Sequence, residues 1–431
     1  MSYRTYEDYV DSNIEWVNII PKHWNTIKIK HLIDYYTTGA WGSDKQNDNN
    51  DIICIRIADF DYPKRNIKDL NYTIRNIPIN NRLLLQPGDL LIEKSGGGEK
   101  QPVGRVVLFD KDFKATFSNF ISKIKVKNEF DSKYLCYIFN MLYSSRVNTK
   151  SIKQTTGLQN LDSYAYFDET IAIANLPEQK QIANYLDKKT ATIDATIAKN
   201  EELIELLEEK RVALINQVVT KGLNPDVPMK DSGVEWIGEI PEHWEITKVK
   251  HELDFLDHKR VPLSAEVRSD MDRIYEYYGA SGVIDKVDSY LFDGKYILVG
   301  EDGANLLSRS TPLAFIAEGK FWVNNHAHIL SPKYSNNIDY YASLLEAADY
   351  TPFIEGSAQP KLTADNLKNI ILIKPPLFEQ NDIATFLNHE LSIINQILSK
   401  IQNNIILLEE YKTSLIHHVV TGKIDVRGEE I

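Results

Sequence analysis

The chain has 431 residues, of which 43% are apolar and 26% are charged, and its formal net charge is minus 12. This composition is typical of a soluble globular protein with room for two domains. No apolar run approaches the roughly 18 residues of a membrane span, and the N-terminus MSYRTYEDYV lacks the pattern of a signal peptide. We therefore expect a cytoplasmic protein with no membrane partner. Its two cysteines, Cys54 and Cys136, form neither a disulfide framework nor a metal-ligand pair.

The N-terminal part of the chain is repeated further along. IEWVNIIPKHWNTIKIKH at 14–31 returns as VEWIGEIPEHWEITKVKH at 234–251, which is 220 positions later. A second repeated segment begins at Glu178 and again at Glu379, 201 positions later. Each half is therefore one complete unit, and only the stretch between the repeated segments differs. A duplicated frame with two unlike inserts suits a chain that must read two different things in one fixed geometry.

The first insert looks like a small mixed α/β domain that is rich in strands. Residues 51–57, 87–92 and 105–109 are expected to be strands, and the glycine-rich stretch 94–100 is expected to be a loop. Residues 1–175 carry 23 Lys and Arg against 21 Asp and Glu. This half is therefore slightly basic, although the whole chain is acidic.

A long helix follows the first insert, and a similar helix ends the second half. Residues that are mostly apolar recur at steps of mostly four and three, as in a coiled-coil seam, and the polar seam positions Asn200, Arg211 and Lys412 are expected to help fix its register. The first set is Ile182, Leu186, Thr190, Ile193, Ile197, Asn200, Ile204, Leu207, Arg211, Leu214 and Val218. The second set is Ile383, Leu387, Leu391, Ile394, Leu398, Ile401, Ile405, Leu408, Lys412, Leu415 and Val419. Proline precedes each helix and glycine follows it. Neither stripe can face water, so we expect each helix to cover the other.

The length of these helices indicates a spacer. Residues 178–220 correspond to on the order of 60 Å of helix at about 1.5 Å per residue. If a pseudo-twofold axis relates the halves, the helices pair antiparallel and the two inserts lie at opposite ends, facing alike. A turn of B-DNA is only about 34 Å, so two inserts held that far apart on one duplex cannot contact adjacent bases. They would recognise two short half-sites with an unrecognised gap between them.

The second insert repeats the layout of the first with different side chains. Residues 294–299 and 313–317 are expected to be strands, separated by a loop at 301–309. Ser118-Asn119-Phe120 corresponds to Asn324-Asn325-His326. Residues 231–375 carry 14 Lys and Arg against 23 Asp and Glu. This acidity counts against DNA binding, unless a local patch or a partner subunit supplies basic surface.

Loops that keep their place while their chemistry changes are candidates for recognition surfaces. Their Lys and Arg side chains can bond guanine or phosphate, and their Asn and Gln side chains match adenine in the major groove. The alternative is that most of these side chains cap turns or lie in solvent. The candidate DNA-binding residues are Lys94, Ser95, Lys100, Arg105, Asn119, Gln159, Ser308, Arg309, Asn324, Asn325, Gln359 and Lys361.

The sequence carries no pattern for catalysis or metal binding. It has neither the GxxxxGK[ST] pattern of an ATP phosphate cradle nor the Asn-Pro-Pro-aromatic run of amino-methyltransferases. His326-Ala-His328 places two rings on one face of a strand, but a third ligand at matching spacing is missing. We expect His23-Trp24 and His243-Trp244 to pack against the ends of the long helices. The chain is therefore predicted to be neither an enzyme nor a metal protein.

These observations predict a mixed α/β (α+β) fold with two similar domains and two long antiparallel coiled-coil helices in a pseudo-twofold repeat. The first domain is expected at 1–175 and its helix at 176–222. The second domain is expected at 223–375, its helix at 376–423, and a C-terminal tail at 424–431.

The two halves resemble the specificity (S) subunit of type I restriction-modification systems, over essentially the whole chain. The similar motifs come in pairs: IPKHW with IPEHW, LPEQKQIANYLDK with PPLFEQNDIATFLN, and LINQVVTKGL with LIHHVVTGKI. Their order, doubling and spacing carry the resemblance. It implies that each insert is a target recognition domain that reads one half of a bipartite site in double-stranded DNA.

The same resemblance implies partners. The helices would act as the spacer and as part of the dock for two methyltransferase (M) subunits. Adenine methylation and translocation-coupled cleavage would belong to those subunits and to restriction/translocase (R) subunits, which would use S-adenosylmethionine, ATP and Mg. This chain would bind no cofactor itself.

Two other functions remain open from the residues alone. A coiled-coil scaffold with two protein-binding modules would show the same repeat, and the acidic second insert would suit it better. A hydrolase or transferase that works alone would need a convergent polar site in one insert, and the sequence indicates none.

Overall fold

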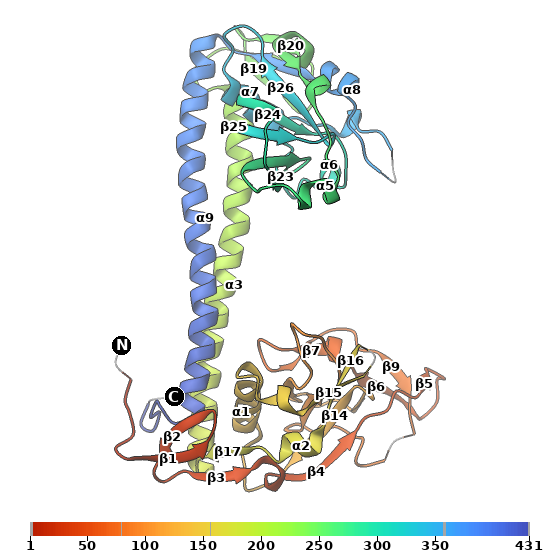
Figure 1. The fold of residues 1–431 in the computed structure, drawn as a ribbon, viewed down its shortest axis with the longest axis vertical. Helices are drawn as coiled ribbons and strands as arrows, with labels where there is room; N and C mark the ends of the chain where they lie inside the picture. The colour runs from red at the N-terminus through yellow and green to blue at the C-terminus, as the bar shows by residue number, and fades with distance from the viewer. Residues whose placement is uncertain (1–2, 79, 156, 357–358, 430–431) are drawn as a thin grey trace. The chain divides into compact units, whose positions relative to one another are not determined.

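The protein is described here by a computed structural model that covers residues 3–78, 80–155, 157–356 and 359–429. The chain divides into two compact units, of which the first is Met1–Asn200 with Asn403–Ile431 and the second is Glu201–Gln402. The long helices α3 (Leu176–Lys221) and α9 (Leu377–Val420) each contribute residues to both units (Figure 1). The two predicted long helices are thus confirmed.

Most strands of the first unit lie between its two repeated segments, that is, between residues 31 and 178. Its strands are β1 (Tyr9–Ile14), β2 (Val17–Pro21), β3 (Asn25–Lys28), β4 (Ile33–Thr38), β5 (Ser43–Asp44), β6 (Asp51–Ile55), β7 (Phe60–Asp61), β8 (Asn66–Ile67), β9 (Ile74–Asn76), β10 (Leu90–Glu93), β11 (Ser95–Gly96), β12 (Val106–Leu108), β13 (Ala115–Phe117), β14 (Ile121–Val126), β15 (Ile152–Thr155), β16 (Leu158–Leu161) and β17 (Thr170–Ile173). Its shorter helices are α1 (Ser132–Ser144) and α2 (Ser163–Phe167), with 3₁₀ turns η1 (Ile29–His31), η2 (Ile57–Asp59) and η3 (Val147–Ser151).

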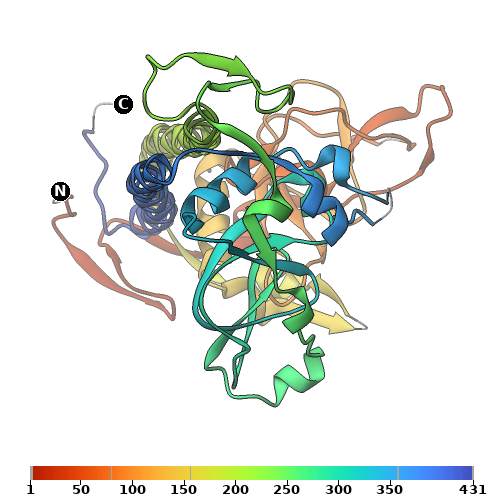
Figure 2. The same cartoon turned by 90° about the horizontal axis from the view of Figure 1, so that it is seen from above.

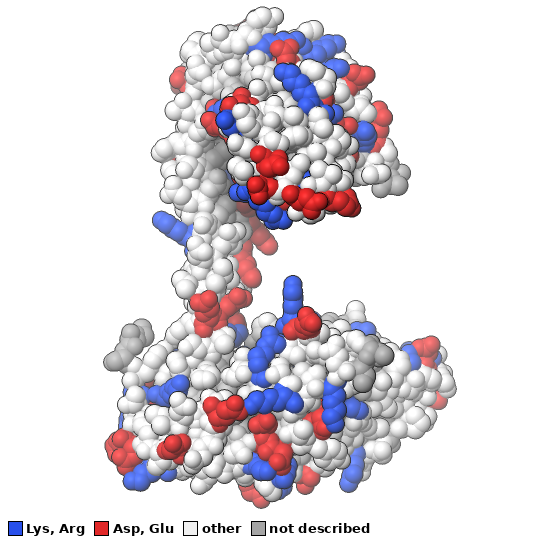
Figure 3. Space-filling view, viewed as in Figure 1, with Lys and Arg blue, Asp and Glu red and all other residues white. Residues whose placement is uncertain are grey.

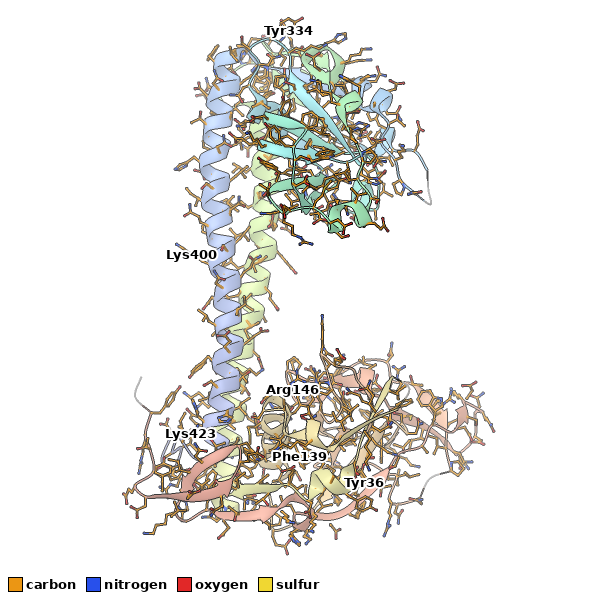
Figure 4. The ribbon with its side chains drawn as sticks, in the orientation of Figure 1. Tyr36, Phe139, Arg146, Tyr334, Lys400 and Lys423 are labelled. Carbon is orange, nitrogen blue, oxygen red and sulfur yellow. The ribbon has the colours of Figure 1, made fainter. Side chains whose placement is uncertain are left out.

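A four-stranded antiparallel sheet in the order β12-β10-β14-β4 forms the centre of this domain. All four residues of β10 are buried, as expected for a central strand that is covered on both faces. A chain of aromatic contacts links this sheet to the helices, from Tyr36 on β4 through Phe167 and Tyr166 on α2 to Phe139 on α1 (Figure 4). A second sheet, in the order β13-β6-β9-β5, is built mostly from residues 43–76 and 115–117.

The second unit repeats the central sheet and enlarges it. Its strands are β18 (Met229–Asp231), β19 (Glu239–Pro241), β20 (Glu245–Lys248), β21 (Leu253–Phe255), β22 (Tyr275–Gly279), β23 (Gly282–Val287), β24 (Phe292–Gly300), β25 (Ala314–Val323), β26 (Ala327–Pro332) and β27 (Ile371–Lys374). Its shorter helices are α4 (Val249–Glu252), α5 (Ala265–Ser269), α6 (Asn305–Ser308), α7 (Ile338–Ala347) and α8 (Ala364–Asn369), with 3₁₀ turns η4 (Asp257–Lys259) and η5 (Thr351–Phe353). The order β21-β26-β24-β25 matches β4-β14-β10-β12, and β22 and β23 continue the sheet beyond β25.

The two long helices pack side by side, as both views show for the paired segments (Figure 2). In the first unit, Ile182 and Leu186 of α3 share a buried cluster with Leu415 and Val419 of α9. In the second unit, Val218 shares a cluster with Ile383 and Leu387. The start of one helix therefore lies with the end of the other in each unit, which is an antiparallel pairing.

The seam carries one polar contact that helps to define its register. Lys412 of α9 bonds Asp194 of α3 and the backbone oxygen of Pro63. Burial lowers the pKa of Lys412, and its bond with Asp194 only partly offsets this effect. A buried charge of this kind favours one alignment of the two helices over shifted ones.

Each long helix is also bonded to the rest of its domain through a Glu-Gln pair in its first turn. Gln179 accepts the backbone N–H of Asp131, which caps α1, over 2.8 Å. Gln380 accepts the equivalent N–H of Asn337, which caps α7, over 2.9 Å. The neighbouring glutamates bond the His-Trp pairs, which confirms that these pairs pack at the helix ends.

The predicted strands are present, although β6 ends at Ile55 and Ile57 begins η2. Each of the two predicted loops contains a short element, which in the stretch 94–100 is strand β11 (Ser95–Gly96). Residues 301–309 were expected to be a loop, but residues Asn305–Ser308 form the short helix α6. It ends at Arg309, which adopts the left-handed conformation at φ 49°. Within the described residues, no helix combines the length and the apolar character that a bilayer crossing requires.

Candidate nucleic-acid interface

The surface of the first domain is hollowed on both sides of η2. A cavity of about 780 Å³ is lined by Tyr62, Glu93, Arg105 and residues 97–101, of which 97–100 belong to the glycine-rich stretch 94–100. A second cavity of about 360 Å³ has a different set of walls, namely Trp41, Arg56, Ser118, Asn119 and Phe120. Ile57 and Ala58 of η2 line both cavities, so the two adjoin along this turn. We call the whole surface the η2 groove.

The larger cavity of the η2 groove holds an arginine between aromatic rings. The Arg105 guanidinium lies 4.3 Å from the ring centre of Tyr62 and 5.1 Å from that of Tyr143. The Tyr62 hydroxyl donates to Glu93, and burial raises the pKa of this carboxyl. These contacts hold the charged end of Arg105 in place at the cavity wall, where it can bond an anion or a base edge.

The glycine-rich stretch is tied to the turn that carries Asn119 and Phe120. The backbone N–H groups of Lys94 and Ser95 both donate to the carbonyl oxygen of Phe120, over 2.8 and 3.3 Å. Five predicted residues, Lys94, Ser95, Lys100, Arg105 and Asn119, therefore come from segments that meet around the η2 groove. In Figure 3, the face of this domain that is turned to the viewer carries Lys and Arg interspersed with Asp and Glu.

Gln159 occupies a different position from the one that its chemistry suggested. Its side chain is only 6% exposed, and its carbonyl oxygen accepts the backbone N–H of Val103 over 3.3 Å. Its neighbour Asn160 bonds the Ser95 hydroxyl over 2.6 Å. Gln159 therefore supports the glycine-rich stretch from within, whereas an exposed side chain that contacts DNA was predicted at this position.

Three segments of the second domain meet at the end of β24. The backbone N–H of Glu301 donates to the carbonyl oxygen of His326 over 2.9 Å. The backbone N–H of Leu362 donates to the carbonyl oxygen of Glu301 over 2.7 Å. Gly303 donates to Pro360 over 3.1 Å. These bonds gather residues 301–303, 324–326 and 359–362 into one surface, which we call the β24 loop cluster. Asn324, Asn325, Gln359 and Lys361 are the predicted residues that belong to it.

Ion pairs join the β24 loop cluster to η4. Arg260 Nη1 lies 2.6 Å from Glu301 Oε2, and Lys361 Nζ lies 3.3 Å from Glu301 Oε1. His328 Nδ1 lies 2.6 Å from Asp257 Oδ2, while its Nε2 faces the carbonyl oxygen of Leu362 at 2.9 Å. Burial raises the pKa values of Asp257 and Glu301, but their hydrogen bonds and nearby positive charges outweigh it and leave both lowered. Several acids of this domain thus have internal partners.

Two predicted residues of the second domain lie outside this cluster. Arg309 Nη1 donates to the carbonyl oxygen of Ala348 over 3.1 Å, and its Nη2 donates to that of Glu346. The guanidinium therefore braces α6 against the end of α7 instead of facing a ligand. Ser308 bonds Ser310 over 3.3 Å. Within the cluster, Asn324 is only 6% exposed and Asn325 is exposed, so Asn325 is the one that can reach a base.

The structure also brings in residues that sequence reasoning missed. Trp41, Arg56 and Phe120 line the smaller cavity of the η2 groove, and Arg260 and Asp302 organise the β24 loop cluster. The position of Phe120 beside Asn119 was a usable signal, because a large apolar residue at a turn needs a reason. No comparable signal marked Arg260, which meets Glu301 only in the folded chain.

The histidines of the second domain do not share a ligand. His326 bonds Asp302 over 2.8 Å, and His328 bonds Asp257 over 2.6 Å, so the two rings face different carboxylates. Across the described parts of the chain, no three His, Cys, Asp or Glu side chains are grouped as a metal site requires.

Comparison with known proteins identifies the family. The model of the type I restriction modification DNA specificity domain matches this chain twice, at residues 21–205 and 241–406. The chain belongs to this family. Each match contains most of one domain and the first part of the long helix that follows it. Members of the family are specificity subunits, which are non-catalytic targeting components of restriction-modification complexes.

Individual relatives extend the match to nearly the whole chain. A Methanocaldococcus jannaschii protein, provisionally named the type I restriction enzyme MjaX specificity subunit, is 26% identical over 446 aligned residues that cover 97% of this chain and 98% of that protein. The provisionally named subunit S.HindORF215P of Haemophilus influenzae is 32% identical over 136 residues, which are 31% of this chain and 34% of that protein.

A solved structure supports the fold. This structure, described as showing complex assembly and conformational transition of the type I R-M system, contains a chain that aligns with a TM-score of 0.64 at 14% identity. The alignment covers 94% of this chain and 99% of that one. It supports the mixed α/β fold with its long helices and carries no conclusion about individual side chains.

Proposed function

We propose that this specificity subunit reads a bipartite site in double-stranded DNA, with one half assigned to each domain. The observation that carries the proposal is the repeated central sheet, in the orders β12-β10-β14-β4 and β25-β24-β26-β21, with unlike surface segments attached to it. The two sheets are equivalent, but one carries the η2 groove and the other carries the β24 loop cluster. Such a pair of domains is suited to recognise two different DNA sequences. The reading domains would be 1–175 and 223–375, and the spacer helices 176–222 and 376–423.

The contacts with DNA would come from exposed polar residues of these two surfaces. In the first domain, Lys94 and Lys100 suit phosphate or guanine, and Arg105 and Asn119 suit base edges. Ser95 donates its hydroxyl to Asn160 over 2.6 Å and would hold the stretch 94–100 in place. In the second domain, the contacts would come from Asn325 and Gln359, which are exposed, and from Lys361, whose side chain stays 52% exposed beside Glu301. Asn324 is buried, and Ser308 and Arg309 bond other parts of the protein. The pairing of Asp257 with Arg260, and of Glu301 with Arg260 and Lys361, removes part of the charge that opposes DNA binding.

The long helices would set the gap between the two half-sites. α3 has 46 residues, which correspond to about 70 Å of helix, and its buried contacts with α9 hold it in a defined alignment. Adding residues to such a helix should increase the distance between its ends by about 1.5 Å per residue. The spacer proposal therefore predicts how many base pairs the gap gains.

The helices would also dock the methyltransferase subunits. Large apolar side chains are exposed on α9, at Phe386, Ile393 and Ile397 in the second unit and at Leu407 and Tyr411 in the first. Steps of seven and four place such residues on one helix face within each unit. An exposed apolar stripe of this kind marks a protein contact. The complex would act on DNA in the cytoplasm, where its M and R subunits would carry out the catalysis and use the cofactors.

An exchange of one reading domain tests the assignment of half-sites. Residues 25–160 are replaced by the equivalent stretch of a related specificity subunit, and the assembled methyltransferase complex is mapped by single-molecule methylation sequencing. We expect one half of the target to change and the other half to stay. A change in both halves would contradict independent readers, and a complex without sequence preference would favour the scaffold function instead.

An insertion tests the spacer. Four residues added within 201–209 lengthen an α-helix by about 6 Å, or nearly two base pairs. Because four residues are not a whole heptad, an insertion of seven residues at the same place serves as the control that preserves the seam. We expect the methylated sites to show a wider gap with unchanged half-sites. A gap of the original length in both variants would remove the spacer role.

A further inference from the structure

We propose that Trp41 and Phe120 form a slot in the first domain that selects a thymine by enclosing its 5-methyl group. The inference rests on the proposed reading of DNA by this domain and names one base and the residues that recognise it. The slot is the smaller cavity of the η2 groove, of about 360 Å³. Its remaining walls include Ile57 and Ala58, which are also apolar.

The turn between β13 and β14 presents Phe120 to solvent. Ile121 donates its N–H to the carbonyl oxygen of Ser118 over 3.0 Å, which closes a four-residue turn with Asn119 and Phe120 at its centre. The side chain of Phe120 is 42% exposed. Central positions of turns usually carry small or polar residues, and folding gains little from a phenyl ring that is left in water. A ligand that covers the ring would explain why a phenylalanine occupies this exposed position.

Trp41, another residue that lines the slot, is held in place by Arg75. The Arg75 guanidinium lies 4.5 Å from the centre of the indole, and Arg75 Nε donates to the Trp41 carbonyl oxygen over 3.1 Å. The indole nevertheless remains 39% exposed. The segment before Trp41 is bonded to the Phe120 turn, because Ala40 donates to Phe117 over 3.0 Å. The two segments that carry the aromatic side chains therefore stand in a preformed arrangement, which lowers the entropic cost of binding.

The chemistry of the slot matches one feature of the major groove. The thymine methyl is the apolar group that a base pair presents there, and phenylalanine is one of the side chains that contact it. Asn119 is adjacent on the turn, and an amide can bond the N6 and N7 atoms of adenine. One A·T pair can thus satisfy both central residues of the turn. Arg56, which is held by Asp59 over 3.1 Å, adds positive charge at the edge.

The equivalent turn of the second domain carries different side chains. Asn325 and His326 correspond to Asn119 and Phe120, and the His326 ring is bonded to Asp302 over 2.8 Å. An imidazole paired with a carboxylate offers polar atoms where the first domain offers a phenyl ring. The same turn therefore reads different bases in the two half-sites, and the methyl preference belongs to the first domain alone.

The test uses the full-length chain assembled with its methyltransferase subunits and the target found by methylation mapping. In duplexes of that target, each thymine is replaced one at a time by deoxyuridine, which lacks only the 5-methyl group. We expect one position in the half-site of the first domain to bind about fourfold more weakly, as the loss of one buried methyl group implies. Phe120→Ala should bind the thymine and deoxyuridine duplexes equally, whereas His326→Ala should keep the fourfold difference.

Several outcomes overturn the proposal while sequence-specific reading stays intact. These are a half-site without thymine on either strand, equal binding of all deoxyuridine duplexes by the unmodified complex, and a difference that persists in both Phe120→Ala and Trp41→Ala. The proposed function fails in a separate way, when the complex binds no preferred sequence or when the exchange of residues 25–160 leaves both half-sites unchanged. Phe120 is exposed, so its substitution should leave the fold and the second half-site unaffected.

Discussion

The indole N–H of Trp24 donates to Glu178 Oε1 over 3.1 Å, which joins the first repeated segment to the first turn of α3. Trp244 makes the same bond to Glu379 over 2.9 Å at the start of α9. In each half of the chain, the IPKHW or IPEHW motif therefore contacts the Glu-Gln pair at the start of the long helix. This explains why they recur together: either motif alone would leave a polar group without its partner.

Removal of the Glu178 carboxylate should destabilise the first unit more than the matched change destabilises the second. Glu178 accepts bonds from Tyr6, His23 and Trp24, and its side chain is 3% exposed. Glu379 bonds two partners and is 22% exposed. We expect Glu178→Ala to lower the free energy of unfolding by about 2–4 kcal/mol and Glu379→Ala by about 1–2 kcal/mol.

Urea unfolding followed by tryptophan fluorescence and circular dichroism measures both effects, with separate transitions fitted where the units unfold independently. Glu178→Gln is the control, because it keeps one acceptor oxygen and should lose less than Glu178→Ala. An unchanged midpoint in Glu178→Ala would show that these bonds contribute nothing to stability.

The glycines that end the long helices should differ in their tolerance of a side chain. Gly222 and Gly422 both have φ of 74°, where an L-residue costs about 1–2 kcal/mol. A Cβ atom at Gly422 would also lie 2.3 Å from Pro21, whereas one at Gly222 would lie 3.1 Å from Trp244. We expect Gly422→Ala to cost about 2–4 kcal/mol and Gly222→Ala about 1–2 kcal/mol. Thermal unfolding of both variants compares them, and equal losses would contradict the close approach of Pro21.

The long helices could be predicted because their cause is local. Regular apolar steps from Ile182 to Val218, the absence of internal proline and a glycine after each end determine a helix without knowledge of its partners. The doubling of the motifs then predicted two similar domains. Helix α6 was missed because four residues carry too little periodicity, and its end depends on the bonds of Arg309 with Ala348 and Glu346.

The candidate site could be predicted only in part, because residue type indicates what a side chain can bond and not what it does bond. Asn119 and Lys100 lie at the η2 groove as their loops suggested. Gln159 has the same chemistry as an exposed reader, but the backbone N–H of Val103 takes its oxygen. Trp41 was missed because it lies in the short segment between Gly39 and Gly42, which shows no periodic pattern, and only the folded chain brings it to the Phe120 turn.

The ion pairs of the β24 loop cluster make the second unit sensitive to acid. The folded state lowers the pKa of Asp257 below its ordinary value of 3.8, so the carboxylate stabilises the fold fully above that pH. This contribution is lost as the pH falls through the lowered pKa. We expect Asp257→Asn to lose about 1–3 kcal/mol at pH 7, and the difference from the unmodified protein to shrink below pH 3.8.

Urea unfolding at pH 7 and at pH 3 measures this difference. Asp254→Asn is the matched control, because Asp254 is exposed and its contact with Lys333 is 3.7 Å long. A difference of equal size at both pH values would show that the Asp257 charge does not stabilise the second unit.

Substitution of Lys100 should separate attraction to phosphate from reading of bases. Lys100 is exposed on the glycine-rich stretch of the η2 groove, and a lysine that contacts a phosphate adds about one unit to the slope of log affinity against log salt. We expect Lys100→Ala to weaken binding of the assembled complex to every sequence alike and to reduce that slope by about one. Asn119→Ala should instead keep the slope and relax the preference at one base pair by about 1–3 kcal/mol. Fluorescence anisotropy titrations over a range of salt concentrations, with matched and mismatched duplexes, distinguish the two effects. A Lys100→Ala complex with unchanged slope would place this side chain away from the DNA backbone.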